Sequence, residues 1–241
     1  MVKTILVFAL LAVQSFLVAQ YQHPQLSQKK VRFYTSSEWE LIFSGADVTR
    51  NDASVANVLR FTAFINSGQF GNVDFGRYFG IGFGLGNRNI GMITRTDNTM
   101  LKQRTYSLYA PFFLKVGDMR RRIYFYTGAQ YEWFYNYKEK LFVDNVKVSK
   151  FSEWFSDRTP NFMPSVFAGV QLPLGFNLKF TYMLHNFVNS DFQILQNGTL
   201  VRPYEGVKAQ VFCLSLSFNI RSNPRRTDFN YSSSPAERQS L

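Results

Sequence analysis

The sequence has one cysteine and two histidines among its 241 residues. The single cysteine, Cys213, excludes an internal disulfide, and no spacing of cysteine and histidine suggests zinc. After residue 20 no apolar run approaches the roughly 18–20 residues that a transmembrane helix needs, which excludes helices of the inner-membrane kind. Because cysteine and histidine are so few and are not spaced as ligands, we expect no metal site, and we expect no cofactor.

The first residues are typical of a targeting segment. Lys3 precedes an apolar run from Ile5 to Val13, and the small residue Ala19 precedes polar sequence. This order predicts a signal peptide over residues 1–19, cleaved near Ala19. An uncleaved membrane anchor is the alternative, but the apolar run is at the short limit for spanning and no cysteine follows that could be acylated.

Basic residues outnumber acidic ones, with 27 Lys and Arg against 16 Asp and Glu and a formal net charge of +11. Export argues against nucleic acid as the partner of this charge. Outer-membrane lipid and anionic lipopolysaccharide fit better, with envelope proteins as further candidates, and a merely solvated basic surface is the alternative.

From about residue 32 the chain alternates apolar and polar residues with a period of two, as strands do. In one such segment Phe79, Ile81, Phe83 and Leu85 alternate with glycines, which a helix would not tolerate. The expected strands are Ser37–Gly45, Val58–Asn66, Tyr78–Ile93, Thr105–Val116, Ile123–Tyr137, Ser165–Leu172, Phe176–Phe187 and Val207–Ile220.

The connections between these segments alternate in length. The compact ones are Ser67–Phe75, Gly117–Arg121 and Pro173–Gly175, and the mostly longer ones are Ala46–Asn57, Thr94–Arg104, Lys138–Phe162 and Asn189–Gly206. Short periplasmic turns alternating with longer outer loops are typical of membrane barrels. The sequence therefore predicts an all-β fold, an eight-stranded antiparallel up-and-down transmembrane β-barrel with both termini in the periplasm.

A soluble, lipocalin-like barrel would show the same alternation with its apolar face inward. The second face of the segments mixes glycine, serine and isolated charges, which suits a narrow polar lumen better than a surface in bulk water. The predicted organisation is a signal peptide at 1–19, an N-terminal periplasmic segment at 20–31, the barrel at 32–220 and a disordered basic periplasmic tail at 221–241.

Four segments carry a resemblance to a known family: the signal end at Val18–Gln20, the glycine-rich stretch Gly84–Gly91 (GLGNRNIG), Tyr137–Lys140 (YKEK) and the strand Met163–Gln171 (MPSVFAGVQ). Over roughly residues 32–220 the chain resembles the outer-membrane β-barrel proteins of Bacteroidota, which include the PorT-like barrels. The resemblance implies the fold and an outer-membrane location only. The tail after the last strand departs from barrels that end at a terminal aromatic residue.

Isolated charges fall on the face expected to line the lumen. Glu40, Lys115 and Lys179 are placed in the periplasmic half, and Arg60, Glu132 and His185 in the outer half. Charges confined in a small barrel need partners, so we expect a salt-bridged plug in which Glu40 neutralises Lys115 and Lys179, and Glu132 pairs with Arg60. A small gated pore or a proton-linked site is the alternative.

Several aromatic residues suit the rims of a membrane barrel. Trp39, near the inner end of the first strand, and Trp133 and Tyr135, near the outer end of the fifth, are expected in the two aromatic girdles. Trp154 and Phe155 fall in the longest outer loop. They are candidates for contact with a partner, although packing of that loop on itself is favoured.

Catalysis has little support in the sequence. His185 lies near Ser190, Asp191 and Glu205, which leaves a hydrolase triad conceivable but without a recognisable motif. The sequence thus favours a non-enzymatic outer-membrane barrel that acts as a structural or interaction component of the envelope. A narrow channel for small solutes comes second and an outer-membrane lipid hydrolase third.

Overall fold

A computed structural model describes residues 31–196, 198–222 and 225–227, and the predicted signal peptide lies outside them. Within those ranges no helix has the length and apolar character to span a membrane. The elements are β1 (Val31–Arg50), β2 (Ala53–Ser54), β3 (Ala56–Val58), β4 (Arg60–Thr62), β5 (Ser67–Phe75), β6 (Phe79–Thr96), β7 (Thr99–Asp118), β8 (Ile123–Val143), β9 (Val146–Trp154), β10 (Phe162–Gln171), the short 3₁₀ turn η1 (Pro173–Gly175), β11 (Phe176–Met183), β12 (Ile194–Gln196), β13 (Thr199–Val201), β14 (Val207–Arg221) and β15 (Arg225–Thr227).

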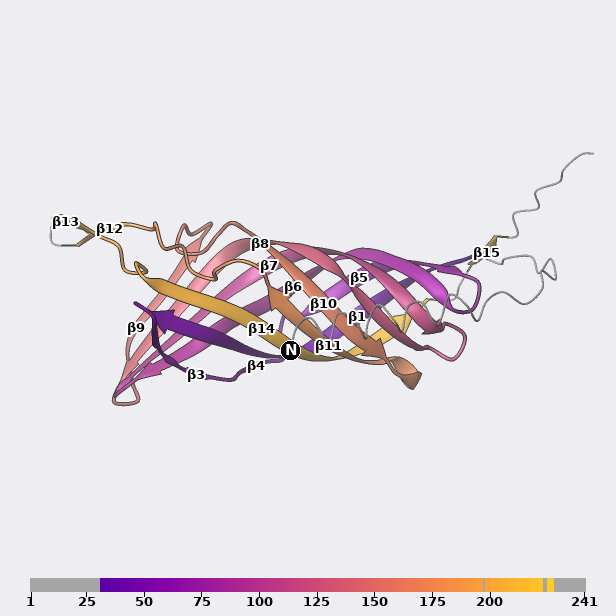
Figure 1. Ribbon diagram of the computed structural model, residues 1–241, viewed down its shortest axis with the longest axis horizontal. Helices are drawn as coiled ribbons and strands as arrows, with labels where there is room; N and C mark the ends of the chain where they lie inside the picture. The colour runs from indigo at the N-terminus through magenta and orange to yellow at the C-terminus, as the bar shows by residue number, and fades with distance from the viewer. Residues whose placement is uncertain (1–30, 197, 223–224, 228–241) are drawn as a thin grey trace, which may run out of the picture.

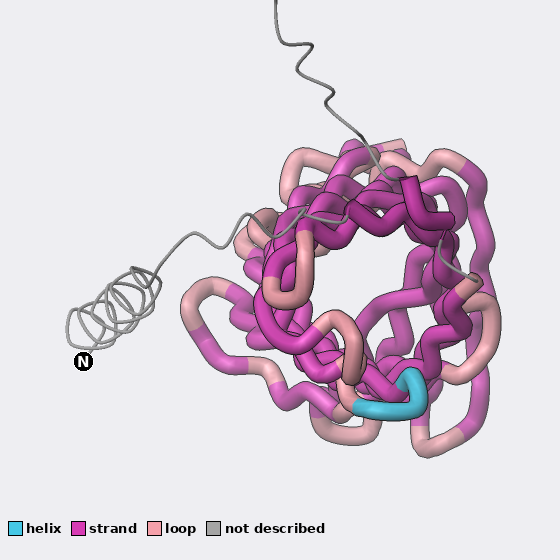
Figure 2. The backbone as a smooth tube through the Cα atoms, turned by 90° about the vertical axis from the view of Figure 1, so that its right-hand side faces the viewer, coloured by secondary structure: helices cyan, strands magenta, loops and turns pink. Residues whose placement is uncertain are grey.

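Eight of these strands close into a ring. In order around the ring they are β1, β5, β6, β7, β8, β10, β11 and β14, and β14 pairs again with β1. Every pairing is antiparallel, and each strand of the ring follows its neighbour along the chain. Figure 2 looks along this ring. The fold is the predicted eight-stranded antiparallel up-and-down barrel.

The two ends of the barrel differ in the length of their connections. At one end residues 76–78, 119–122 and 172–175 join neighbouring strands, and the first residues of β1 lie at this end together with β15 (Figure 1). At the other end the chain passes through residues 51–66, the β8–β9 hairpin and residues 184–206. The predicted loop at 94–104 is instead a continuation of β6 and β7, joined by a turn at Asp97 and Asn98. That prediction was wrong because β6 and β7 have 18 and 20 residues, well beyond the roughly 9–11 residues expected for a strand of a membrane barrel.

The second strand was also predicted in the wrong place. The barrel strand is β5, whose residues were expected to form a turn, whereas the expected strand Val58–Asn66 is an irregular stretch that includes β4 and has Ile65 at a φ of +65°. The sequence of β5, SGQFGNVDF, contains the small and polar residues that usually mark turns. In this barrel Gly68, Asn72 and Asp74 face the lumen, where such residues fit.

The glycines of β6 make room for aromatic side chains inside the barrel. A Cβ atom at Gly82 would overlap the ring of Phe113, and one at Gly86 would overlap the ring of Tyr109. Both rings come from the neighbouring strand β7. The glycine row that alternates with Phe83 and Leu85 therefore serves packing across the lumen.

The segment predicted as the tail, residues 221–241, includes strand residues. Arg221 is the last residue of β14, and β15 pairs with the first residues of β1, with Val31 opposite Thr227. Residues 225–227 of the predicted tail therefore form a short strand against β1.

Candidate functional site

The side chains of the barrel are arranged with apolar residues outside and polar residues inside. On β7, Leu108, Phe112 and Leu114 are 45%, 53% and 42% exposed on the outer wall, whereas the alternating residues Tyr109 and Lys115 are buried in the lumen. Most other strands of the ring repeat this alternation; the exceptions are β5, where Ser67 and Gln69 are exposed, and β6, which is buried throughout residues 88–92. A lipocalin-like barrel has the reverse arrangement, so the structure contradicts that alternative. The lumen is the candidate functional site.

An ion pair between Arg88 and Glu132 crosses the middle of the lumen. Both side chains are fully buried, and Nε of Arg88 lies 3.0 Å from Oε2 of Glu132. Ser107, Ser165 and Gln130 also donate hydrogen bonds to this carboxylate. Donors from four strands thus converge on one buried anion.

A second set lies beside the first and contains two carboxylates and one ammonium group. Nζ of Lys179 pairs with Oε1 of Glu40 and lies 3.9 Å from Oε1 of Glu38. Ser217 donates a hydrogen bond to Glu38. These groups tie β1 to β11 and β14.

A third set occupies the end of the lumen near the short turns. Asp74 lies 2.7 Å from Nζ of Lys115, 3.1 Å from Arg32 and 3.8 Å from Arg221. Nζ of Lys115 also donates to the hydroxyl of Tyr34. Three cations from three strands therefore share one buried carboxylate.

The predicted lumen residues thus meet only in part. Lys179 pairs with Glu40 as expected, but Lys115 pairs with Asp74, and Glu132 pairs with Arg88. Arg60 is buried and donates instead to the backbone and side-chain oxygens of Asn89. These assignments were wrong because the stagger of the strands sets the height of each side chain in the lumen, and the face of a strand alone does not.

His185 was also placed wrongly. It follows the end of β11 and is exposed, so it does not line the lumen. Nearby, the amide of Asn186 donates to the hydroxyl of Ser190. In the ranges that the structure describes, no hydrogen bond joins His185 to Ser190, Asp191 or Glu205.

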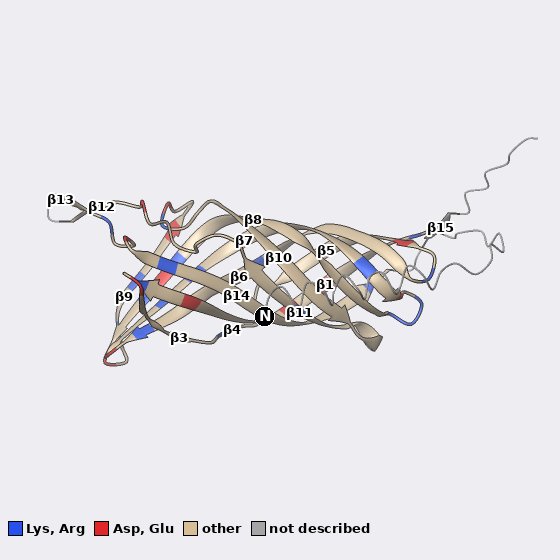
Figure 3. Cartoon of the chain, viewed as in Figure 1, with Lys and Arg blue, Asp and Glu red and all other residues tan. Residues whose placement is uncertain are grey.

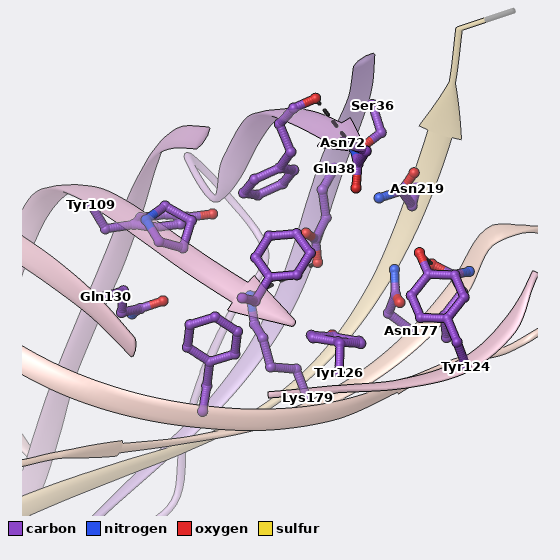
Figure 4. A pocket seen from close by; sticks show the side chains of 15 residues that line it. Ser36, Glu38, Asn72, Tyr109, Tyr124, Tyr126, Gln130, Asn177, Lys179 and Asn219 are labelled. Atoms are coloured by element: carbon purple, nitrogen blue, oxygen red, sulfur yellow. Dashed lines mark hydrogen bonds and ion pairs between the residues drawn. The ribbon is translucent and has the colours of Figure 1, made fainter. Parts of the chain in front are cut away.

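Aromatic rings narrow the lumen between the charged sets. The ring of Phe113 lies 6.1 Å from that of Phe70, 5.8 Å from Tyr126 and 6.2 Å from Phe167. They leave a cavity of about 30 Å³, room for about two water molecules. Figure 4 shows Lys179 and Glu38 pointing into this space.

The end of the lumen near the long connections is closed by an apolar cluster. Residues of the barrel wall and of the 184–206 connection pack together here; the buried members are Ile42, Ala46, Val48, Ile90, Met92, Phe134, Met163, Met183, Phe187, Val188, Tyr204, Ala209, Val211 and Cys213. The hydroxyl of Tyr204 accepts a hydrogen bond from Arg158, 3.3 Å away. Burial raises the pKa of Tyr204, so its phenol stays neutral.

The predicted girdle and loop aromatics form one outer surface. Trp133 stacks on Phe155 with ring centres 5.6 Å apart, and Tyr135 stacks on Trp154 at 5.7 Å. The two loop aromatics therefore lie against the wall, next to the residues expected in the girdle. Trp39 is also on the outer face, 49% exposed, and is opposite Phe218 of β14.

Asp74, Arg88 and Glu38 are lumen residues that sequence reasoning missed. Arg88 stands two residues after Gly86 in the glycine-rich alternation, so the period of two could have identified it. Asp74 carried no such signal, since its strand was read as a turn.

Comparison with known proteins finds similarity only among solved structures. No family model matches the chain, and no curated protein matches it. The attachment invasion locus protein Ail of Yersinia pestis, solved with the heparin analogue sucrose octasulfate, is 11% identical with a TM-score of 0.35, over 78% of this chain and 99% of Ail. The outer membrane protein OprG from Pseudomonas aeruginosa is 10% identical with a TM-score of 0.35, over 81% of this chain and 98% of OprG. CarO of Acinetobacter baumannii is 10% identical with a TM-score of 0.34, over 81% of this chain and 99% of CarO.

Proposed function

We propose that the chain is an integral outer-membrane barrel whose lumen is filled by side chains and which serves as a structural or interaction component of the envelope. The observation that carries the proposal is that apolar side chains are exposed and charged ones are buried, the reverse of the distribution in a water-soluble protein. A wall of exposed Phe, Leu and Val surrounds an interior that buries Arg88, Lys115, Glu132 and Lys179. Water would disfavour such a wall, whereas a lipid bilayer stabilises it, and a closed barrel satisfies its backbone hydrogen bonds without help from the solvent.

The location and orientation follow from the same proposal. Spanning barrels of this kind have short periplasmic turns and longer outer loops, so the end with residues 76–78, 119–122 and 172–175 is placed in the periplasm. Lipid and lipopolysaccharide are then the immediate partners. The resemblance of the sequence to outer-membrane barrels of Bacteroidota supports this location, and we include membership of that group in the proposal.

The filled lumen favours a closed barrel over a channel. The apolar cluster occupies one end of the lumen, the buried ion pairs occupy its middle, and the ring of Phe113 packs with its neighbours between them, where the cavity described above measures about 30 Å³. The alternative, a narrow channel for small solutes, is supported by the charged side chains of Glu38 and Lys179 in the lining of that cavity and requires side chains to move. A lipid hydrolase is a weaker alternative, and we assign no catalytic residue.

Conductance in planar lipid bilayers separates the closed barrel from the channel. We expect the purified chain to insert without producing steady single-channel openings, because ions would have to displace buried salt bridges. Insertion is checked independently by the change in mobility on gels between unheated and heated samples. Steady openings from correctly inserted protein would make the channel the better proposal.

A further inference from the structure

Cations face one another across three strands on the outer wall near the long connections. Lys102 of β7 is opposite Lys140 of β8, and Lys140 is opposite Lys150 of β9. Two residues along, Arg104 is opposite Lys138. Residues opposite one another in an antiparallel pair share a face, so five cations lie on one surface, called here the cation row. Figure 3 shows this gathering of Lys and Arg beside β9.

The cation row lacks anionic partners within the described part of the chain, where no carboxylate oxygen lies within 4.0 Å of its nitrogens. The nearby acids Glu139 and Glu153 point to the opposite face, where Tyr137 donates to Glu139 and Ser156 donates to Glu153. Like charges directly opposite one another destabilise a sheet. An anion from outside the chain would remove this cost.

The cation row borders an apolar groove. The groove has a volume of about 470 Å³, and Lys102, Arg104 and Tyr106 line one side of it. Its other side is the irregular stretch after β3, where four apolar side chains are 55–81% exposed: Leu59, Phe61, Phe64 and Ile65. A ligand that fills both parts needs an anionic head and an apolar chain.

Aromatic residues fix the depth of this surface in the proposed membrane. The ring of Tyr106 lies 4.7 Å from Nζ of Lys138 and 6.3 Å from the ring of Tyr135, which stacks on Trp154. Aromatic girdles mark the level of the lipid headgroups. The cation row begins at this girdle and extends toward the long connections, where phosphate groups of the outer leaflet would lie.

We propose that the cation row and the groove bind an acylated lipid of the outer leaflet whose headgroup carries at least two phosphates. The phosphates neutralise the facing lysines, and one acyl chain occupies the groove beside Phe61 and Phe64. This inference rests on the proposed membrane location and the proposed lipid partners, and it adds the binding surface and the requirement for phosphates.

Binding of purified lipid A tests the inference. The protein is first inserted into phosphatidylcholine liposomes and then extracted into a zwitterionic detergent. It is titrated there with diphosphorylated lipid A, and native mass spectrometry measures the fraction of protein with bound lipid. We expect the triple variant Lys102→Gln, Lys140→Gln, Lys150→Gln to bind roughly a hundredfold more weakly. Each lysine near an anionic lipid surface contributes about 1 kcal/mol of binding free energy, and a loss of about 1.4 kcal/mol weakens binding tenfold. Lipid A stripped of its phosphates should bind the unaltered protein about as weakly.

A matched variant controls for net charge. Arg50→Gln, Arg202→Gln, Lys208→Gln removes three exposed cations from the same end of the barrel and should bind lipid A as the unaltered protein does. In the absence of lipid the first triple variant should unfold at the same or a higher temperature, because it has lost facing like charges. Equal affinity of both triple variants would overturn the lipid site, whether both bind well or both bind poorly. Failure of the unaltered protein to insert into the liposomes would instead contradict the membrane proposal itself.

Discussion

Replacing Glu132 by glutamine is expected to lower the free energy of unfolding by about 3–5 kcal/mol, because it removes one partner of a buried ion pair. Arg88 would keep its charge in a site with no exposure and no other carboxylate within 4.0 Å among the described residues. The serines that now donate to Glu132 would also lose an anionic acceptor. Unfolding in denaturant, followed by tryptophan fluorescence in liposomes, measures the change.

The double variant Arg88→Met, Glu132→Gln identifies the cause. If the loss comes from an unpaired cation, removing that cation should recover most of it, since replacing a whole buried pair is often nearly neutral. Asp52→Asn provides the control, because Asp52 and its partner Lys208 are 89% and 78% exposed and such pairs contribute about 0–1 kcal/mol. A silent Glu132→Gln variant would show that water reaches this level of the lumen and would favour the channel.

Replacing Phe112 by arginine is expected to cost about 2–4 kcal/mol in a bilayer, the penalty for a cation on the lipid face near the midplane. Phe112 is on the outer wall of β7, four residues from Leu108 and four from Val116. Leu108 is opposite the girdle residue Trp133, and Val116 is close to the short turn at 119–122, so Phe112 lies midway between the two ends of the wall. Leu200→Arg is the matched control: Leu200 is 66% exposed on β13 in the 184–206 connection, where a surface change should alter stability by less than about 0.5 kcal/mol. Equal effects of the two variants would mean that the wall does not face lipid.

Most of the barrel could be predicted from the alternation of residues. The period of two identified seven of the eight ring strands, because outer-wall positions such as Phe112 and Leu114 alternate with inward positions. It failed at β5, where a lumen lined by glycine, asparagine and aspartate resembles a turn. The apolar residues just before it, including Phe61 and Phe64, imitated a strand.

The partners of the lumen charges could not be predicted in the same way. Alternation places Glu132 and Lys115 on the inward face, but a pairing depends on the stagger accumulated over several strands. Glu132 meets Arg88 from β6, two strands away in the ring, and Lys115 meets Asp74 from β5. Only the pair of Lys179 with Glu40 was correctly foreseen.

Spin labels on the outer wall of β7 test the central proposal most directly. Single cysteines at Ala110, Phe112 and Leu114, in a Cys213→Ala background, would carry nitroxides in phosphatidylcholine liposomes. If the wall faces lipid, dissolved oxygen should relax all three labels strongly and a water-soluble nickel complex should reach none of them. Access of the nickel complex to the labels at 112 and 114 would place this wall in water and contradict the membrane barrel.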